Sequence, residues 1–128
     1  MPSYLLDTSV ILDLINDRNG RRDFIRGLAQ PGDTLGCCLI NVVEVYTGMR
    51  SGEEAITREY FDRLFYHEIT KEAGRLAGRL RYEWRRKGYT ISLADATLAA
   101  VAVAGQLTLL TDNRKHFPMP ELTFHDLP

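Results

Sequence analysis

The stretch SLADATLAAVAVAGQLTLLTDN, residues 92–113, decides the fold of this chain. Nearly every residue from 93 to 103 is apolar, which predicts a helix that is buried on most sides. The apolar run LTLLT follows and predicts a buried strand. Asp95 lies in the first turn of the helix, and no Lys or Arg lies within seven residues of it. Because a buried carboxylate is costly when it is unpaired, Asp95 requires a cap, a distant partner or a metal ion.

Apolar strands alternate with helical segments along the rest of the chain. We expect strands at 3–6, 33–40, 66–69, 107–111 and 122–127, and helices at 8–17, 21–29, 41–49, 53–65, 71–88 and from 93 onward. Such alternation predicts a mainly parallel sheet with helices on both faces. The expected fold is one three-layer α/β/α domain that spans residues 1–128.

The composition limits the class of protein. With 128 residues, 45% of them apolar and 26% charged, the chain has the size and composition of one globular domain. Acidic residues come too early for a signal peptide, and no stretch approaches the roughly 18 apolar residues that a membrane span needs. We therefore expect a cytoplasmic protein. The adjacent Cys37 and Cys38 are expected to pack in a buried strand.

Four acidic residues fall near predicted junctions between elements. Asp7 follows the first strand, Glu44 follows CCLI, Asp95 begins the buried helix, and Asp112 follows LTLLT. Ligands of an open α/β sheet bind beyond the carboxyl ends of its strands. We therefore expect these four carboxylates to lie close together.

Each acid also has a purely structural interpretation. Asp7 could cap a helix, and Asp112 could belong to a turn. Asn41 with Glu44, and Ser92 with Asp95, both fit a capping box. Four acids at four junctions are nevertheless more than capping requires. This coincidence favours a functional site made of these acids.

A cluster of bare carboxylates needs a cation. Two carboxylates at 4 Å repel each other by on the order of 4 kcal/mol at a dielectric constant of about 20. Oxygen ligands without nearby Cys or His suit Mg²⁺ or Mn²⁺ rather than Zn²⁺. The scattered His67, His116 and His125 are interpreted as surface or packing residues.

Three segments together resemble a known family: DTSVILDLI at 7–15, NVVEVYTG at 41–48 and LADATLAAVAVAGQLTLLTDNRKHF at 93–117. Their order and spacing resemble PIN-domain ribonucleases, especially VapC-type toxins of toxin–antitoxin pairs. The resemblance implies a PIN-like fold. It also implies several acids that bind metal, with hydroxyl groups near them. The family has a fourth acid, which in related sequences can sit one residue later than Asp112. The implied residues are Asp7, Glu44 and Asp95 as ligands, Thr8 and Thr111 as hydroxyls, and Asp112 or Asn113 as the fourth position.

The resemblance also implies an activity and partners. The activity is Mg²⁺-dependent hydrolysis of RNA phosphodiester bonds by an endoribonuclease, and the partners are a VapB-type antitoxin and a second copy in a homodimer. A solvated helix face is the default explanation of Arg79 and Arg86 in the basic segment, and both are candidates for contacts with RNA phosphates if that helix borders the site.

Two other classes of protein stay open. A phosphatase or phosphotransfer domain would use Asp7 as nucleophile, but DTSVI lacks the second acid two residues on that such phosphatases typically carry. A non-catalytic binding module would keep the fold without cleaving RNA. A Mg²⁺ titration separates these classes.

Overall fold

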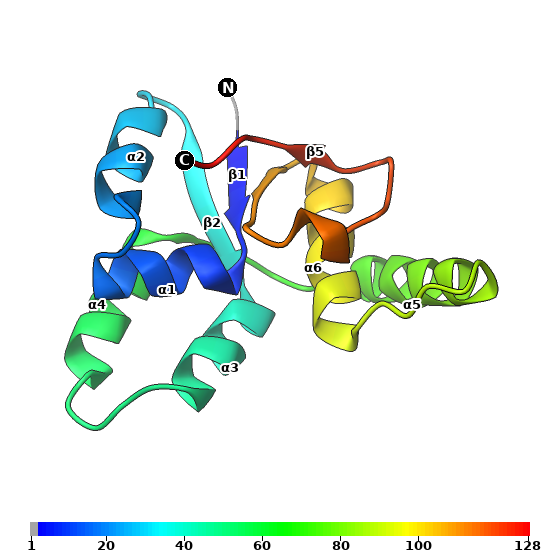
Figure 1. Cartoon of the computed structure of the whole chain (residues 1–128), viewed down its shortest axis with the longest axis horizontal. Coiled ribbons are helices and arrows are strands. Elements are labelled where there is room, and N and C mark those ends of the chain that lie inside the picture. The colour runs from blue at the N-terminus through cyan, green and yellow to red at the C-terminus, as the bar shows by residue number, and fades with distance from the viewer. Residues whose placement is uncertain (1–2) are drawn as a thin grey trace.

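The computed structural model describes residues 3–128, and its centre is a five-stranded sheet (Figure 1). The strand order is β3-β2-β1-β4-β5, and every neighbouring pair runs parallel, as the alternation of elements predicted. The strands are β1 Ser3–Leu6, β2 Thr34–Cys38, β3 Phe65–His67, β4 Thr108–Leu110 and β5 Thr123–Phe124.

Helices cover both faces of this sheet. They are α1 Thr8–Asn16, α2 Arg21–Leu28, α3 Leu39–Thr47, α4 Glu54–Arg63, α5 Lys71–Arg86 and α6 Leu93–Gly105, with a short 3-10 turn at Arg114–His116. Helices α1 to α4 gather on one side of β1 and β2, and α5 and α6 lie on the other side (Figure 1). The arrangement confirms the three-layer α/β/α prediction. Within residues 3–128, no helix has the length and apolar character needed to cross a membrane.

Alternating side chains of the strands build two separate cores. Leu5 and Cys38 pack with α5 and α6, whereas Tyr4, Leu6 and Cys37 pack with the helices of the opposite face. Successive strand residues point to opposite faces, so one strand serves both layers. Both cysteines are free and buried, as expected of core residues.

The apolar helix α6 is buried along most of its length. All seven residues from 96 to 102 are buried, which confirms the prediction for this segment. Helix α5 packs on it through Ala73, Ala77 and Leu80, which follow helical spacing along one face. Small alanine side chains allow the two helices to approach closely, and α6 becomes the centre of its layer.

Strand β2 ends two residues earlier than predicted, and α3 begins correspondingly earlier. Cys38 is the N-cap of α3, because its N–H donates to the Oδ1 atom of Asn41 at 2.8 Å. The predicted capping box between Asn41 and Glu44 is therefore wrong. Asn41 is fully buried inside the first turn, and Glu44 lies one turn further along the helix.

Candidate active site

The carboxyl ends of β1 and β4 meet at Asp7. The Asp7 N–H donates to the carbonyl oxygen of Leu110 at 2.9 Å. Its Oδ1 atom accepts from the Thr8 N–H at 2.7 Å, which makes Asp7 the N-cap of α1. Its Oδ2 atom accepts from the Thr111 hydroxyl at 2.6 Å. Asp7 is therefore a helix cap and also the buried carboxylate at the junction of two central strands.

Burial is the largest cause that raises the pKa of Asp7 above its ordinary value. The neighbouring carboxylates of Asp95 and Glu44 raise it further, whereas hydrogen bonds from the Thr111 hydroxyl and the Thr8 N–H lower it. The structure thus brings the first three predicted acids into electrostatic contact. Because negative charge is disfavoured here, a cation at this place would be stabilised.

Glu44 is oriented by a chain of polar groups. The Thr8 hydroxyl donates to the Oε1 atom of Glu44 at 2.7 Å, and the Asn41 side-chain amide donates to that hydroxyl at 3.2 Å. Asn41 is in turn held by the Cys38 N–H. The sequence assigned Asn41 only a capping role. The sequence does carry one signal for the role of Asn41 in positioning Thr8, since Asn41 is the only polar residue in an apolar run.

Asp7 is oriented by a second chain of the same kind. The Asn113 N–H donates to the Thr111 hydroxyl at 2.9 Å, and that hydroxyl donates to Asp7. A hydroxyl has one proton, so each threonine commits it to a carboxylate. Thr8 and Thr111 therefore each donate to one of the predicted acids and accept from an asparagine N–H.

The Asp95 carboxylate does not cap the start of α6. The Ser92 hydroxyl accepts the Asp95 N–H at 3.0 Å, so Ser92 is the N-cap. The Asp95 carboxylate is partly buried, and its Oδ2 atom lies 3.6 Å from Nδ1 of His116. His67 and His125 pack against aromatic rings, but His116 stands beside a predicted site residue, which its interpretation as a surface or packing residue did not anticipate.

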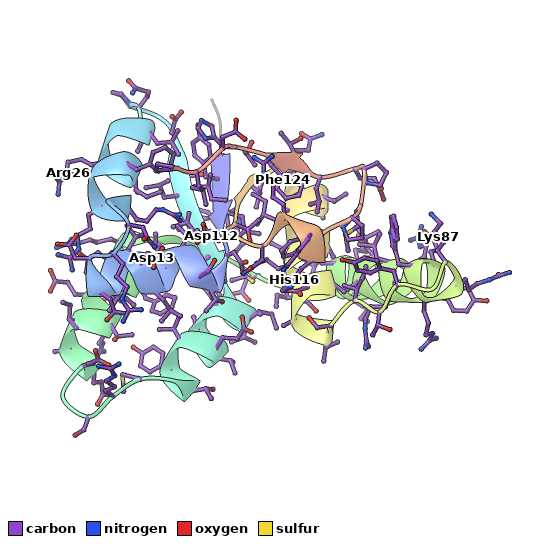
Figure 2. The ribbon with its side chains drawn as sticks, viewed as in Figure 1. Asp13, Arg26, Lys87, Asp112, His116 and Phe124 are labelled. Atoms are coloured by element: carbon purple, nitrogen blue, oxygen red, sulfur yellow. The ribbon has the colours of Figure 1, made fainter. Side chains whose placement is uncertain are left out.

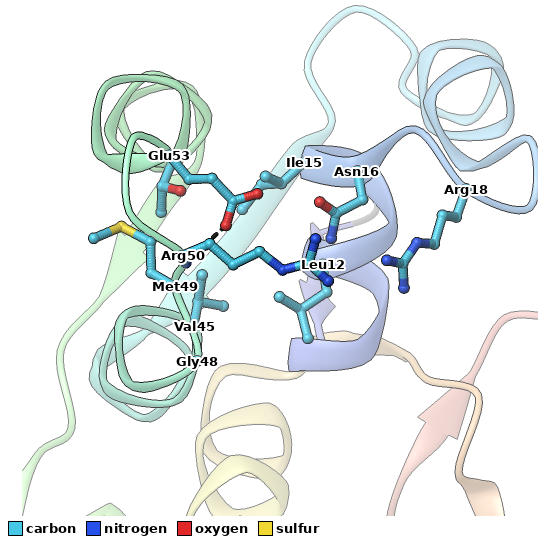
Figure 3. Close-up of a pocket in the computed structure, with 10 residues that line it drawn as sticks. Leu12, Ile15, Asn16, Arg18, Val45, Gly48, Met49, Arg50 and Glu53 are labelled. Atoms are coloured by element: carbon cyan, nitrogen blue, oxygen red, sulfur yellow. Dashed lines mark hydrogen bonds between the residues drawn. The ribbon is translucent and has the colours of Figure 1, made fainter.

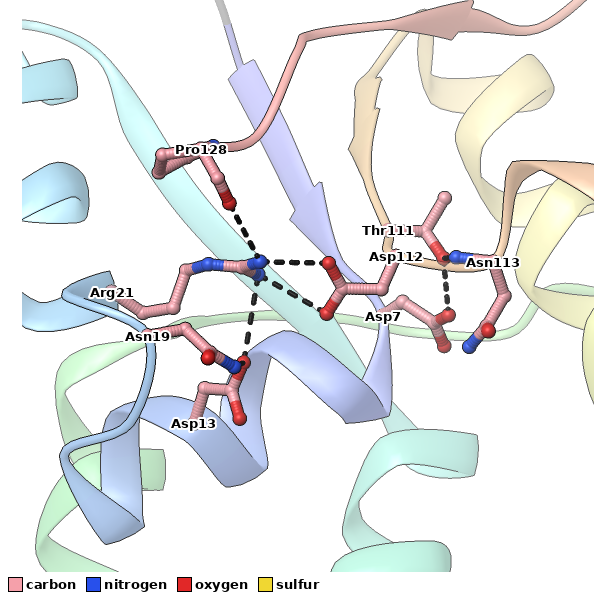
Figure 4. A network of polar contacts seen from close by, with 8 residues as sticks. All are labelled: Asp7, Asp13, Asn19, Arg21, Thr111, Asp112, Asn113 and Pro128. Carbon is pink, nitrogen blue, oxygen red and sulfur yellow. Dashed lines mark hydrogen bonds and ion pairs between the residues drawn. The ribbon is translucent and has the colours of Figure 1, made fainter.

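Asp112 is directed away from this group of acids. The buried Arg21 guanidinium donates to both of its oxygens, from Nη2 to Oδ1 at 2.7 Å and from Nη1 to Oδ2 at 3.2 Å. Figure 4 shows Asp112 turned toward Arg21, while the side chain of Asn113 lies on the side of Asp7. The role of Asp112 as a metal ligand stays a prediction, and it would require release of Arg21.

The donor set of the acids fits a hard divalent cation. Asp7, Glu44 and Asp95 offer carboxylate oxygens from three different elements, and the raised pKa of Asp7 marks the place where positive charge is favoured. Within residues 3–128, no three acidic, histidine or cysteine side chains are grouped closely enough to enclose an ion as they stand. Neighbouring carboxylates repel one another, and a bound cation would offset this repulsion.

The basic helix α5 projects away from the sheet. Arg79 and Arg86 are exposed, and the Arg86 guanidinium lies 5.7 Å from the centre of the Tyr82 ring. Figure 2 shows Lys87 at the end of this helix, well separated from Asp112 and His116 in this view. Hydrogen bonds and ion pairs among the described residues do not connect either arginine to the acids, so contact with RNA stays a prediction for both.

A cavity of about 190 Å³ lies elsewhere, between α1, α3 and the start of α4 (Figure 3). Leu12, Ile15 and Val45 form its apolar wall, and Glu53 accepts from the Arg50 N–H at its rim. None of the four predicted acids lines it. This cavity is therefore distinct from the acid cluster.

The fold and the acids at its carboxyl edge define an α/β protein with a candidate metal site. The PIN domain family matches residues 4–120, and the chain belongs to this family. It is 28% identical to Ribonuclease VapC19 of Mycobacterium tuberculosis over 119 residues, which cover 92% of this chain and 95% of that protein. It is also 28% identical to Ribonuclease VapC10 of the same organism, over 91% of this chain and 87% of that protein.

Solved structures share the fold. A chain of VapBC2 from Rickettsia felis, bound to a DNA fragment from its promoter, superposes with a TM-score of 0.88 at 24% identity. The match covers 98% of this chain and 99% of that chain. A chain of VapBC-1 from nontypeable Haemophilus influenzae gives a TM-score of 0.82 at 22% identity and covers 97% of both chains. These likenesses confirm the PIN-like fold that the sequence predicted.

Proposed function

We propose that this single domain, residues 1–128, is a metal-dependent endoribonuclease and the toxin of a type II toxin–antitoxin pair. The observation that carries the proposal is the buried Asp7, whose pKa is raised by burial and by the carboxylates of Asp95 and Glu44. Membership of the PIN domain family and the ribonuclease names of VapC19 and VapC10 support the choice of RNA. The proposed ligands are Asp7, Glu44 and Asp95, with Mg²⁺ or Mn²⁺ as the ion.

A divalent ion bound there supplies Lewis-acid chemistry, since it lowers the pKa of water and offsets charge that develops on the phosphodiester. The protein's own contribution is to hold the oxygens in place. Thr111 and Thr8 donate to Asp7 and Glu44, so the hydroxyls hold these two carboxylates in fixed orientations. The partly buried Asp95 would supply the third carboxylate. Carboxylates held by hydrogen bonds in this way are already oriented before RNA binds.

The geometry gives little support to nucleophilic catalysis by the protein. Ser9 Oγ is buried and has no hydrogen-bond partner among the described residues, so no histidine activates it. Both oxygens of Asp7 already accept hydrogen bonds from Thr8 and Thr111, which lowers the nucleophilicity of that carboxylate. Attack by water, rather than by a side chain, is therefore the proposed step.

The partner protein in this proposal is a VapB-type antitoxin. The solved relatives from Rickettsia felis and Haemophilus influenzae are VapBC assemblies, and this supports the proposal. We also propose a homodimer and a cytoplasmic location, where RNA is available. Expression of the chain alone should arrest growth of a bacterial host, and the neighbouring small reading frame should restore growth. Harmless expression of a protein that cleaves RNA in vitro would count against the toxin role only.

An RNA cleavage assay tests the enzymatic proposal. Purified protein should produce discrete cuts in structured RNAs with Mg²⁺ or Mn²⁺, and none in EDTA. Asp7→Asn should abolish the cuts, whereas Asp62→Asn, which changes an exposed acid of α4, should leave them unchanged. Cleavage that persists in EDTA would exclude the proposed chemistry. Mg²⁺ binding without cleavage of any RNA would instead favour a binding module.

A further inference from the structure

A small cavity opens directly beside Asp95. Its volume is about 240 Å³, and it is formed by the end of the loop between α5 and α6, the start of α6 and the 3-10 turn. Its lining residues are Tyr89, Thr90, Ile91, Ser92, Asp95 and His116. Apart from Asp95, the proposed reaction gives none of these residues a role.

We propose that this cavity binds one RNA base adjacent to the scissile phosphate and so sets the sequence preference of cleavage. The inference rests on the proposed ribonuclease function. Sites for drug-sized ligands start at about 300 Å³, so this smaller cavity suits a single flat ring system. Sequence-specific RNA recognition takes unstacked bases, which stack on aromatic side chains and hydrogen-bond through their edges.

The chemistry of the walls matches a base. Tyr89 and His116 supply rings for stacking, and the hydroxyls of Thr90 and Ser92 supply polar groups for the base edge. Thr90 is exposed, and the exposed Ser92 hydroxyl, which accepts the Asp95 N–H, keeps its own proton to donate to a ligand. Ile91 forms a buried floor. A ring surface and a polar edge on one cavity can distinguish bases, whereas a phosphate would require neither ring.

Three hydrogen bonds hold Tyr89 and Ile91, two of the lining residues, in place. The Tyr89 hydroxyl donates to the carbonyl oxygen of Lys115, which ties the loop between α5 and α6 to the 3-10 turn. The Tyr89 N–H donates to the carbonyl oxygen of Trp84 at 2.9 Å, and the two rings meet edge to face. The Arg81 side chain donates to the carbonyl oxygen of Ile91 at 3.0 Å. A cavity held open in this way binds without the cost of ordering its walls.

The position of the cavity relates it to the reaction. Asp95 belongs both to the acid group around Asp7 and to this wall. Arg114 and Lys115, of the same 3-10 turn as His116, line a second, open hollow with Asp112 and Asn113. Basic side chains position RNA backbones, while base contacts specify sequence. An RNA strand that follows this turn would place a base in the cavity when its phosphate reaches the acids.

Mapping of cut sites in an RNA pool of random sequence tests this proposal. The wild-type enzyme should show a base preference at one position beside the cut. Tyr89→Ala should flatten that preference and raise KM roughly tenfold, since loss of a stacked base weakens binding by about fivefold to 150-fold. Tyr89→Phe keeps the ring and should keep the preference. Tyr66→Ala removes an exposed tyrosine of β3 and serves as the matched control.

A second variant covers the case in which Tyr89→Ala fails to fold. Thr90→Val removes one exposed hydroxyl with little change of shape, and it should alter which base is preferred. Unchanged preference and KM in folded Tyr89→Ala, or in Thr90→Val if the first does not fold, would overturn the subsite.

Binding of short RNA oligonucleotides in EDTA separates this proposal from the enzymatic one. If the wild type cleaves nothing, the proposed function fails, and fluorescence anisotropy then decides the subsite alone. An affinity at least about fivefold weaker in Tyr89→Ala, but not in Tyr66→Ala, would support the base site. Equal affinities would overturn it.

Discussion

Arg21 binds both carboxylate oxygens of Asp112 across 91 residues of sequence. The guanidinium is almost fully buried, and Oδ2 of Asp13 lies 3.6 Å from it (Figure 4). Asp112 stands between Thr111 and Asn113, the two residues that orient Asp7. The ion pair therefore anchors the loop after β4 to the start of α2, and with it the arrangement around Asp7.

Asp112→Asn separates this anchoring role from metal binding. Breaking the pair leaves the buried guanidinium with only Asp13 and the Pro128 carbonyl oxygen as partners, and the metal-free protein should lose about 1–3 kcal/mol of stability. The stabilisation by Mg²⁺ should be preserved. Urea unfolding in EDTA and in Mg²⁺ measures both quantities. Asp126→Asn breaks the exposed pair with Arg114 and should cost at most about 1 kcal/mol. A variant that keeps its metal-free stability but loses the Mg²⁺ effect would make Asp112 a ligand.

Thr111→Val removes the hydroxyl that donates to Asp7. That hydrogen bond lowers the pKa of Asp7, so its loss should raise the pKa further, and the carbon-detected NMR titration of the carboxyl group should move to higher pH. Mg²⁺ affinity should fall, because the carboxylate form becomes less available. Thr111→Ser retains the donor and should restore both values. An unshifted titration in Thr111→Val would show that the hydroxyl does not act on Asp7.

Gly36→Ala tests the packing of β2 against β3. A Cβ atom at Gly36 would lie 2.5 Å from Nε2 of His67, whose ring rests on the glycine. The variant should lose about 1–3 kcal/mol of stability, as overpacked cores do. Gly74→Ala, in α5 with open space around the position, should instead gain about 0.5–1 kcal/mol. Equal effects in chemical denaturation would contradict the contact with His67.

Burial lowers the pKa of His67 below its ordinary value of 6.5, so the folded protein keeps this ring neutral. The unfolded chain binds a proton more readily in that range, and stability should fall as the pH drops below 6.5. His67→Asn should remove this part of the pH dependence, whereas His125→Asn should not. Melting temperatures between neutral and acidic pH provide the comparison, and parallel curves for wild type and His67→Asn would be the contrary result.

Local patterns in the sequence predicted the layers, although β2 and β5 are shorter than expected. Period and apolar content identified α6 and the central strands, the end of β1 located Asp7, and the start of the apolar helix located Asp95, because those signals depend on neighbouring residues. Three features could not be predicted in this way. The bond between Arg21 and Asp112, the contact of Asn41 with Thr8, and the approach of His116 to Asp95 join segments far apart in the chain. Such contacts depend on the folded topology.

The most direct test of the proposed metal site compares thermal melts of wild type and Asp95→Asn in EDTA and in Mg²⁺. Ser92 caps α6 through the Asp95 N–H, so the substitution keeps the cap and removes one negative charge near Asp7. In EDTA the variant should be as stable as wild type or more stable. At a hundredfold excess of Mg²⁺ over its dissociation constant, wild type should gain about 2.7 kcal/mol, and the variant much less at the same concentration. Equal gains in the two proteins would contradict a metal site that includes Asp95.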